Sequence, residues 1–240
     1  MVRRSWLIAL ALAGTTPLQA APDPRLELGR LEERINEASG ARRWDEAIAL
    51  GREALAIEER TKGPDHPEVG GTLSLIAGWM VEQGKPADAT PYYQRAYDIF
   101  HRQLGPDSDL TEQAASNLAA NLQALGRYDE AEKLYRAALD RALARGATSR
   151  GTALAYNNLG YALGRQGRFT EARDLYAKAL AIALAWDPED LDLALIESNV
   201  AANLDALGRP LEAELGDPHR ERLAVERLGP DDPAVATSYN

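Results

Sequence analysis

An internal repeat of about 42 residues constrains the fold of this chain more than any other feature. Alanine recurs at that spacing in five places, at Ala47, Ala89, Ala131, Ala172 and Ala213. In three of these places the alanine directly follows a glutamate, and an aromatic residue stands three positions before the alanine. Repeats of about 20 to 50 residues are typical of helical arrays in which each unit stacks on its neighbours. The sequence therefore predicts a solenoid of similar units.

Each alanine of the series begins a stripe of small and aromatic residues. A second alanine follows seven residues later in four units, and a tyrosine follows four residues later in three units. Offsets of four and seven fall on one face of an α-helix. A neighbouring helix can approach the alanines closely while the ring fills the space beside them. The residues are Ala54, Ala96, Ala138, Ala179, Tyr93, Tyr135 and Tyr176.

A second stripe lies upstream of the first one in four of the units. A small residue recurs at the same spacing, and each is preceded by a large aliphatic residue. Each period therefore contains two amphipathic helices, which we call its first and second helix. The pairs are Ile76-Ala77, Leu118-Ala119, Leu159-Gly160 and Val200-Ala201.

Glycine and proline separate these helices. Gly63-Pro64-Asp65, Gly105-Pro106-Asp107 and Gly229-Pro230-Asp231 stand between one unit and the next. Glycine ends a helix, proline prevents its continuation, and aspartate can accept the free N–H groups of the next first turn. We therefore expect these aspartates to cap the first helices. Shorter turns at Gly84, Gly126, Gly167 and Gly208 join the two helices within a unit.

The composition agrees with close-packed helices. Apolar residues make up 45% of the 240 residues, but aromatic residues make up only 6%, so alanine and leucine must form most of the core. These two residues favour helices, and the scarcity of aromatic side chains disfavours a β-sandwich. The net charge of −10 argues against a nucleic-acid partner, which requires a basic surface. The absence of cysteine excludes disulfides in any compartment.

The N-terminus has the layout of a secretory signal peptide. Arg3 and Arg4 precede the short apolar run Trp6–Ala13, and cleavage is expected after Ala20. The run is shorter than the roughly 20 apolar residues that span a bilayer, although an uncleaved anchor is the alternative. We expect residues 1–20 to be removed and residues 21–25 to form a short linker. The mature chain would then be periplasmic or secreted, with no membrane span.

The combined pattern resembles the tetratricopeptide repeat family, most closely its kinesin-light-chain-like subtype with repeats of about 42 residues. The resemblance implies an all-α fold, a right-handed superhelix of about five helix pairs plus a partial sixth. It also implies that the first helices line a concave groove for an extended peptide or a partner's helix, without chemistry. The fourth unit carries the likeness in Tyr156-Asn157-Asn158-Leu159-Gly160, Leu163, Gly167-Arg168-Phe169-Thr170-Glu171-Ala172, Tyr176 and Ala179.

The array is expected to span residues 26–240 and to depart from the pattern near both ends. Gly51 replaces the aromatic residue of the first unit, and Arg34 replaces its leucine. Pro218 interrupts the fifth unit, where a proline inside a helix costs about 3 kcal/mol, so a break is expected there. The predicted units are 26–62, 66–104, 108–146, 149–187, 190–228 and the partial unit 231–240.

Three asparagines recur at the groove position that the resemblance implies. Asn117, Asn158 and Asn199 are each one repeat period apart, and an amide side chain carries both a donor and an acceptor. We hypothesise that this series holds the main chain of a peptide, whatever its sequence. The alternative is that these amides bond only to adjacent helices or to water. A helical wheel places Asn157, Asn158, Tyr161 and Arg165 away from the packed side of their helix, so these side chains are expected to face the groove. Neighbouring residues expected to help are Ser116, Asn157, Tyr161, Arg165 and Ser198.

No pattern in the sequence indicates catalysis, a metal site or a cofactor. His66, His101 and His219 are dispersed and lack carboxylates at ligand spacing. Serine, histidine and aspartate all occur, but no nucleophile motif surrounds them. We therefore expect a non-enzymatic protein whose partner is a protein or an extended peptide.

The C-terminus leaves two further interpretations open. Tyr239 and Asn240 are in phase with Tyr156 and Asn157, so the sequence stops within a sixth first helix. Repeat arrays normally end in a polar cap, which this stub lacks. An open end could pair with a second copy and give a homo-oligomer. The other interpretation is the recognition arm of a longer enzyme, such as a repeat–protease fusion.

Overall fold

The computed structural model describes residues 23–146, 148–185 and 191–208, and every regular element in them is a helix. They form four helix pairs and the first helix of a fifth, which confirms the predicted all-α superhelix. The second half of the fifth unit, with Pro218, and the partial sixth unit lie outside the described residues. The helices are α1 (Pro24–Gly40), α2 (Trp44–Lys62), α3 (Pro67–Glu82), α4 (Pro86–Leu104), α5 (Asp109–Ala124), α6 (Tyr128–Arg145), α7 (Arg150–Arg165), α8 (Phe169–Ala183) and α9 (Leu191–Ala206).

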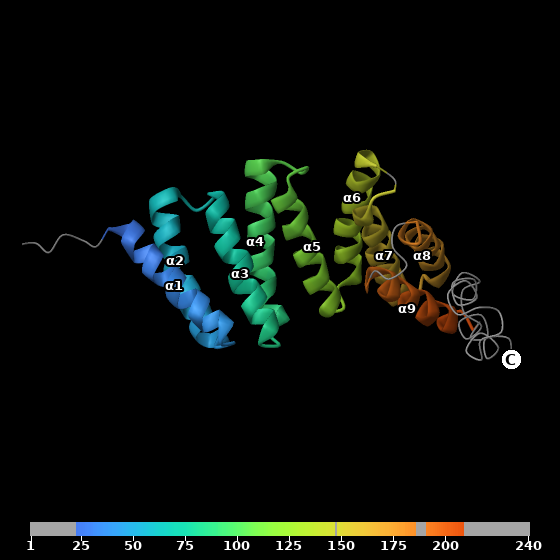
Figure 1. Ribbon diagram of the computed structural model, residues 1–240, viewed down its shortest axis with the longest axis horizontal. Coiled ribbons are helices and arrows are strands. Elements are labelled where there is room, and N and C mark those ends of the chain that lie inside the picture. The colour runs from blue at the N-terminus through green and yellow to red at the C-terminus, as the bar shows by residue number, and fades with distance from the viewer. Residues whose placement is uncertain (1–22, 147, 186–190, 209–240) are drawn as a thin grey trace, which may run out of the picture.

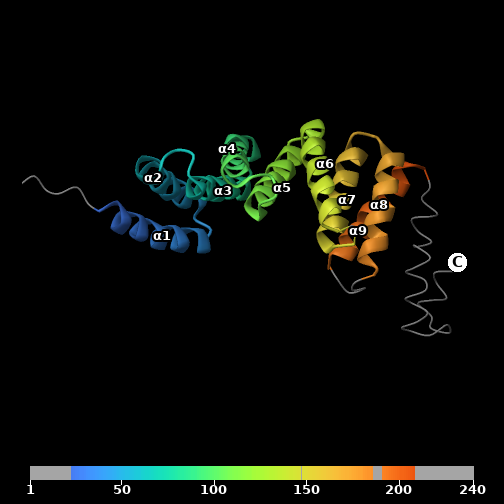
Figure 2. The same ribbon diagram turned by 90° about the horizontal axis from the view of Figure 1, so that it is seen from above.

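The helices stack in chain order, and the stack twists. Each helix packs against the one before and the one after it, and α7 also contacts α9 across two steps. Figure 1 shows α4 along its length and α8 nearly end on, whereas Figure 2 shows the reverse. The helix axes therefore rotate along the array, as expected for a superhelix of helix pairs.

The repeated stripes form the core as predicted. Ala47, Ala89, Ala131 and Ala172 are completely buried, and the tyrosines four residues after the last three are buried beside them. The first-helix pairs Ile76-Ala77, Leu118-Ala119 and Leu159-Gly160 are also buried. One continuous cluster extends from Ile48 to Tyr176. Small residues therefore bring the helices together, and the rings fill the remaining space.

The turns within a unit share one hydrogen-bonding motif. In the second unit the N–H of Lys85 donates to the C=O of Met80 at 2.9 Å, and the N–H of Gly84 donates to the C=O of Val81 at 2.8 Å. This is a Schellman motif, which requires a residue with positive φ. Glycine fills that place in later units, but the first unit has Arg42, with a φ of 55°.

The predicted capping of first helices by aspartate is wrong for Asp65 and Asp107, while Asp231 lies outside the described residues. His66 and Ser108 occupy the N-cap positions of α3 and α5, one residue beyond the aspartates. The His66 Nδ1 accepts from the N–H of Glu68 at 3.3 Å. Asp65 instead accepts from Arg102 of α4 at 3.0 Å. The linker is one residue longer than the Gly-Pro-Asp pattern, so the aspartate falls just outside the cap.

The N-terminal boundary also differs from the expected linker. The α1 helix begins at Pro24, and the Asp23 carboxylate accepts from the N–H of Arg25 at 2.9 Å. The described chain thus enters the first unit two residues before the predicted start at residue 26. The expected signal peptide, residues 1–20, lies outside the described residues. In the part that the structure describes, no helix combines the length and the apolar character that a membrane span requires.

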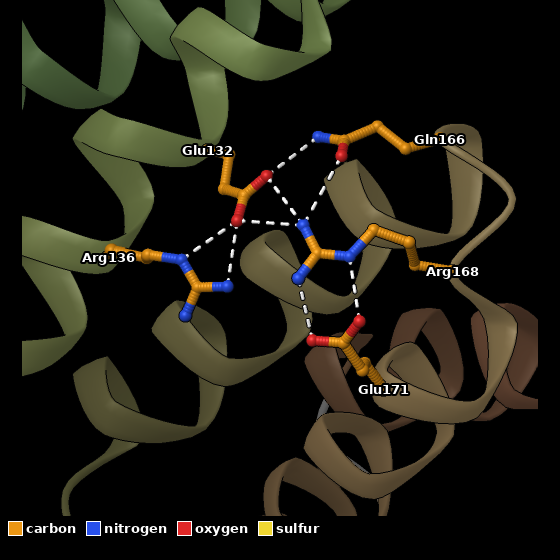
Figure 3. Close-up of polar contacts among 5 residues, drawn as sticks. All are labelled: Glu132, Arg136, Gln166, Arg168 and Glu171. Carbon is orange, nitrogen blue, oxygen red and sulfur yellow. Dashed lines mark hydrogen bonds and ion pairs between the residues drawn. The ribbon is translucent and has the colours of Figure 1, made fainter.

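An ion network joins the third unit to the fourth (Figure 3). The carboxylate of Glu132 in α6 forms ion pairs with the guanidinium groups of Arg136 at 2.7 Å and Arg168 at 3.0 Å. The Gln166 amide donates to the same carboxylate at 2.9 Å. Arg168 also pairs with Glu171 of α8 at 2.6 Å. The turn between α7 and α8 is therefore tied to the preceding second helix.

The carboxyl of Glu132 is held in its charged form. Its side chain is only 15% exposed, and burial alone would raise its pKa. Hydrogen bonds from Gln166, Arg136 and Arg168 outweigh burial, and they lower the pKa below its usual value. The network therefore stabilises the fold at neutral pH, and protonation would weaken it.

Candidate functional site

The three asparagines of the predicted series occupy one position in the successive first helices α5, α7 and α9. Asn117, Asn158 and Asn199 are each half-buried, so every one of these residues keeps some exposure to solvent. Ser116 and Ser198, each one residue earlier, are exposed. We call the side of the first helices that carries these residues the first-helix face. Its polar groups come from separate units, so their spacing depends on how the units stack.

A cavity of about 370 Å³ opens on this face between α7, α8 and α9. Three predicted site residues line it, namely Tyr161, Arg165 and Asn199. The cavity is also lined by residues that were not predicted to bind a ligand. These are Gly164, Phe169, Tyr176, Ala202 and Asn203. We call this space the α7–α9 cavity.

Arg165 stands exposed at this cavity and is oriented by a tyrosine. Its Nε donates to the Tyr128 hydroxyl at 3.0 Å, and its guanidinium carbon lies 5.6 Å from the centre of the same ring. The hydrogen bond from Arg165 to Tyr128 raises the arginine pKa. Within residues 23–146, 148–185 and 191–208, no carboxylate forms an ion pair with Arg165. In this part of the chain, its positive charge therefore remains available to a ligand.

The tyrosine hydroxyls under the face stay protonated. Burial raises the pKa of Tyr135 to about 12, and the nearby Tyr161 adds to the effect. Burial raises the pKa of Tyr176 still further. These groups therefore act only as neutral hydrogen-bonding groups at physiological pH.

The predicted orientation of Asn157 is wrong. Its side chain is only 2% exposed and does not face solvent. The Asn199 Nδ2 donates to the Asn157 Oδ1 at 2.8 Å, and the Asn157 Nδ2 donates to the Asn158 Oδ1 at 3.4 Å. The reason is that α9 packs along α7 and covers this position. The amides of Asn157 and Asn199 therefore bond to each other across adjacent first helices, which is the alternative to binding a peptide.

The sequence pattern that defines the tetratricopeptide repeat family matches four overlapping segments of this chain, residues 39–102, 69–144, 110–185 and 151–215. Together these segments take in most of the chain. The chain belongs to the tetratricopeptide repeat family. The matched segments agree with the helix pairs described above, each spanning about a unit and a half or more.

Solved tetratricopeptide arrays share the fold at low sequence identity. A crystal structure of the Podosopora anserina putative kinesin light chain nearly identical TPR-like repeats has a TM-score of 0.71 and 19% identity, over 84% of this chain and 98% of that one. BtubC (BKLC) from P. vanneervenii has a TM-score of 0.66 and 22% identity, over 87% and 94%. The kinesin-light-chain-like subtype inferred from the sequence is therefore confirmed at the level of fold.

Two curated relatives match part of the array. Tetratricopeptide repeat protein 19, mitochondrial, from Homo sapiens is 33% identical over 97 residues, which are 40% of this chain and 25% of that protein. The Clustered mitochondria protein homolog from Candida albicans is 32% identical over 77 residues, 32% of this chain and 6% of that protein. The match spans a quarter of the length of these relatives or less.

Two buried asparagines of the tetratricopeptide array were not predicted as site residues from the sequence. Asn121 of α5 donates to the C=O of Pro86 at 3.0 Å, and Asn203 of α9 donates to the C=O of Phe169 at 3.0 Å. Each amide reaches the first residue of the preceding second helix. The Oδ1 atoms of both residues are buried without a hydrogen-bond partner among the described residues. The sequence does contain a signal for them, because Asn121 and Asn203 are two repeat periods apart.

A second cavity, of about 310 Å³, lies between α1, α2 and α3 at the other end of the tetratricopeptide array. We call it the α1–α3 cavity. It uses the same positions of the repeat as the α7–α9 cavity, because Leu75 corresponds to Asn199 and Trp79 to Asn203. Over the described residues, no group of three or more histidine, aspartate or glutamate side chains is arranged to hold a metal ion.

Proposed function

We propose that this protein is an exported, non-enzymatic adaptor that holds an extended segment of a partner protein on the first-helix face. One observation carries the proposal. The α7–α9 cavity collects Tyr161, Arg165 and Asn199 from two units at a single opening. Pockets that combine apolar walls with a few convergent polar groups are the usual binding sites of proteins. The family match supports a binding role, since tetratricopeptide arrays present their repeated side chains as an extended surface.

The polar groups of the α7–α9 cavity suit a peptide main chain. The Asn203 Oδ1 is a buried acceptor without a partner in the described part of the chain, so a peptide N–H entering the cavity would satisfy it. Arg165 offers further N–H donors for a carbonyl or a carboxylate. Asn158 and Asn117 continue the series on α7 and α5, where both residues are half-buried. A ligand that spans several units would meet one amide in each.

Binding can be tested by affinity purification from an envelope extract of the source cells. The variant Asn117→Ala, Asn158→Ala, Asn199→Ala should lose the captured partner and keep its helical circular dichroism. A matched control replaces Gln94 and Gln103 with alanine, since both are exposed on the second helix α4. The control should capture the partner as the unchanged chain does. Undiminished capture by the triple variant would exclude the first-helix face.

Export is the part of the proposal that rests on residues 1–20 alone. Two arginines, a short apolar run and Ala20 support cleavage by a signal peptidase. Cell fractionation combined with N-terminal sequencing of the mature chain tests it. We expect a chain in the exported fraction that begins at Ala21. A cytoplasmic chain that still begins at Met1 would refute export without affecting the binding proposal.

A further inference from the structure

The α1–α3 cavity lies in the one described unit that has a glycine where units two to four have a tyrosine. Gly51 stands at that position, and the space where its side chain would be is met by Ile76 and by the Trp79 ring, both at 2.9 Å. Trp79 comes from the next first helix, at the position of Asn121 and Asn203. Ile76 and Trp79 therefore pack directly against the Gly51 backbone, and the α1–α3 cavity opens beside this contact.

The walls of the α1–α3 cavity are largely apolar. Leu28 and Ile35 of α1 and Leu75 and Trp79 of α3 line it. Leu75 is 56% exposed, although it occupies the position that holds an asparagine in the third, fourth and fifth units. A large exposed leucine beside a tryptophan provides apolar surface at the opening, where the later units present an amide.

A buried carboxylate faces this apolar space. Glu58 lines the cavity and is only 8% exposed, and its Oε2 has no hydrogen-bond partner among the described residues. Lys62 is the cation whose charge lowers the pKa of Glu58, but it is already ion-paired with Glu68. Burial raises the pKa of Glu58, and the Thr72 hydroxyl and the charge of Lys62 only partly oppose this. A buried acceptor without a partner is costly, so a donor that enters the cavity would be bound favourably.

The carboxylate is particular to this unit. The corresponding residues of the next three units are Phe100, Ala142 and Ala183, all apolar. Glu32 of α1 adds a second acidic group at the cavity. The combination of aliphatic walls, an aromatic ring and two carboxylates suits one kind of ligand group. A basic side chain has an aliphatic stem to pack on leucine and isoleucine, and a cation for the carboxylate and the ring.

We propose that the α1–α3 cavity binds a basic side chain, lysine or arginine, of the partner polypeptide, with its cation on Glu58. This inference rests on the proposed function, since it assumes that a polypeptide lies along the first-helix face. The inference also requires a positive charge in the part of the partner that lies at the α1–α3 cavity. The α1–α3 end accepts a cation, while the α7–α9 end presents the guanidinium of Arg165. A bound segment would then have a preferred direction along the array.

The test uses 19F NMR of the full chain labelled with 5-fluorotryptophan. Trp79 is one of four tryptophans, and its resonance is assigned by its loss in Trp79→Phe. The probe is the acetylated and amidated pentapeptide Ala-Ala-Lys-Ala-Ala, and the matched peptide has norleucine in place of lysine. The lysine peptide should shift the Trp79 resonance at millimolar concentration, and the norleucine peptide should not.

Variants of α2 locate the effect. Glu58→Gln should weaken binding of the lysine peptide about tenfold or more, because a charge-assisted hydrogen bond is lost. Glu53→Gln removes the same charge from an exposed position of the same helix and should leave the affinity unchanged. An unmoved Trp79 resonance, an equal shift with norleucine, or equal affinity in Glu58→Gln would each overturn the inference.

The outcome for this cavity can be separated from that for the proposed function. The triple asparagine variant changes α5, α7 and α9 only, so it should bind the lysine peptide as the unchanged chain does. If partner capture depends on the asparagines but no lysine effect appears at Trp79, the basic-side-chain inference fails and the adaptor function stands. If partner capture ignores the asparagines, the proposed function fails independently of the peptide result.

Discussion

The contact between α7 and α8 provides a sharp test of how tightly the repeats are packed. Gly160 stands where the second and third units have Ala77 and Ala119. A Cβ at position 160 would lie 2.9 Å from Cε1 and 3.1 Å from Cδ1 of the Tyr176 ring. That ring is only 3% exposed, so it has little room to move. Gly160→Ala therefore forces the ring or the helices apart.

The magnitude follows from two opposing effects. Overpacking a core by one methyl group costs about 1–3 kcal/mol. Alanine favours the helix over glycine by up to about 1 kcal/mol. We therefore expect Gly160→Ala to lower the free energy of unfolding by about 1–2 kcal/mol. The control is Gly71→Ala in α3, where nothing lies within 4 Å of the added Cβ. It should raise the free energy of unfolding by about 0.5–1 kcal/mol.

Urea unfolding followed by far-UV circular dichroism compares the two variants. Because repeat arrays can unfold in parts, hydrogen exchange should locate the loss of Gly160→Ala in α7 and α8. Tyr176→Leu in the same chain should remove most of the clash, which a double-mutant cycle would report as a favourable coupling. Equal stabilisation by Gly160→Ala and Gly71→Ala would refute the reasoning. It would mean that the Tyr176 ring can shift to accept a methyl group at no cost.

Three further substitutions, at the first turn, at the half-buried Glu132 and at the buried Glu58, are tested by urea unfolding. Arg42→Gly should stabilise the chain by about 0.5–1 kcal/mol, since its φ of 55° suits glycine; unchanged or lower stability would contradict this. Glu132→Gln should destabilise it by about 1–2 kcal/mol at neutral pH. Because the network lowers the pKa of Glu132, that loss should shrink as the pH falls through the folded-state value. Glu58→Gln should stabilise the chain by about 1–2 kcal/mol at neutral pH. Burial raises the pKa of Glu58, so this gain should also fade as the pH falls, but starting from a higher pH. A loss of stability in Glu58→Gln at neutral pH would show that the carboxylate has a partner in the fold.

The helix pairs could be predicted because they depend on spacing alone. Alanine and tyrosine at offsets of zero, four and seven define one face of a helix in any unit, and the structure buries that face at Ala131 and Tyr135 as expected. The turn glycines were equally predictable, because Gly84 and Gly126 take the positive φ that most other residues avoid. These features repeat along the array, so each unit supports the interpretation of the next.

Features that depend on two units at once could not be predicted in the same way. A helical wheel of α7 alone places Asn157 toward solvent, but it contains no information about α9, which buries that amide. The capping prediction failed for a similar reason, because a one-residue difference in linker length gave the cap to His66. Both errors concern relations between helices that the repeat spacing leaves undetermined.

The residues that break the repeat are therefore the most informative about binding. A residue that recurs in every unit must suit the packing common to all of them, as Ala89 and Ala131 do with no exposure at all. Gly51 and Glu58 do not recur, and their counterparts in the second unit are the buried aromatic residues Tyr93 and Phe100. Both residues line the α1–α3 cavity, and Glu58 places at it an oxygen that no described residue pairs. The unpaired buried oxygen reduces stability when the cavity is empty, and a bound cation with an apolar stem would offset that cost. The occurrence of Gly51 and Glu58 together in one unit is what favours a ligand over a packing defect.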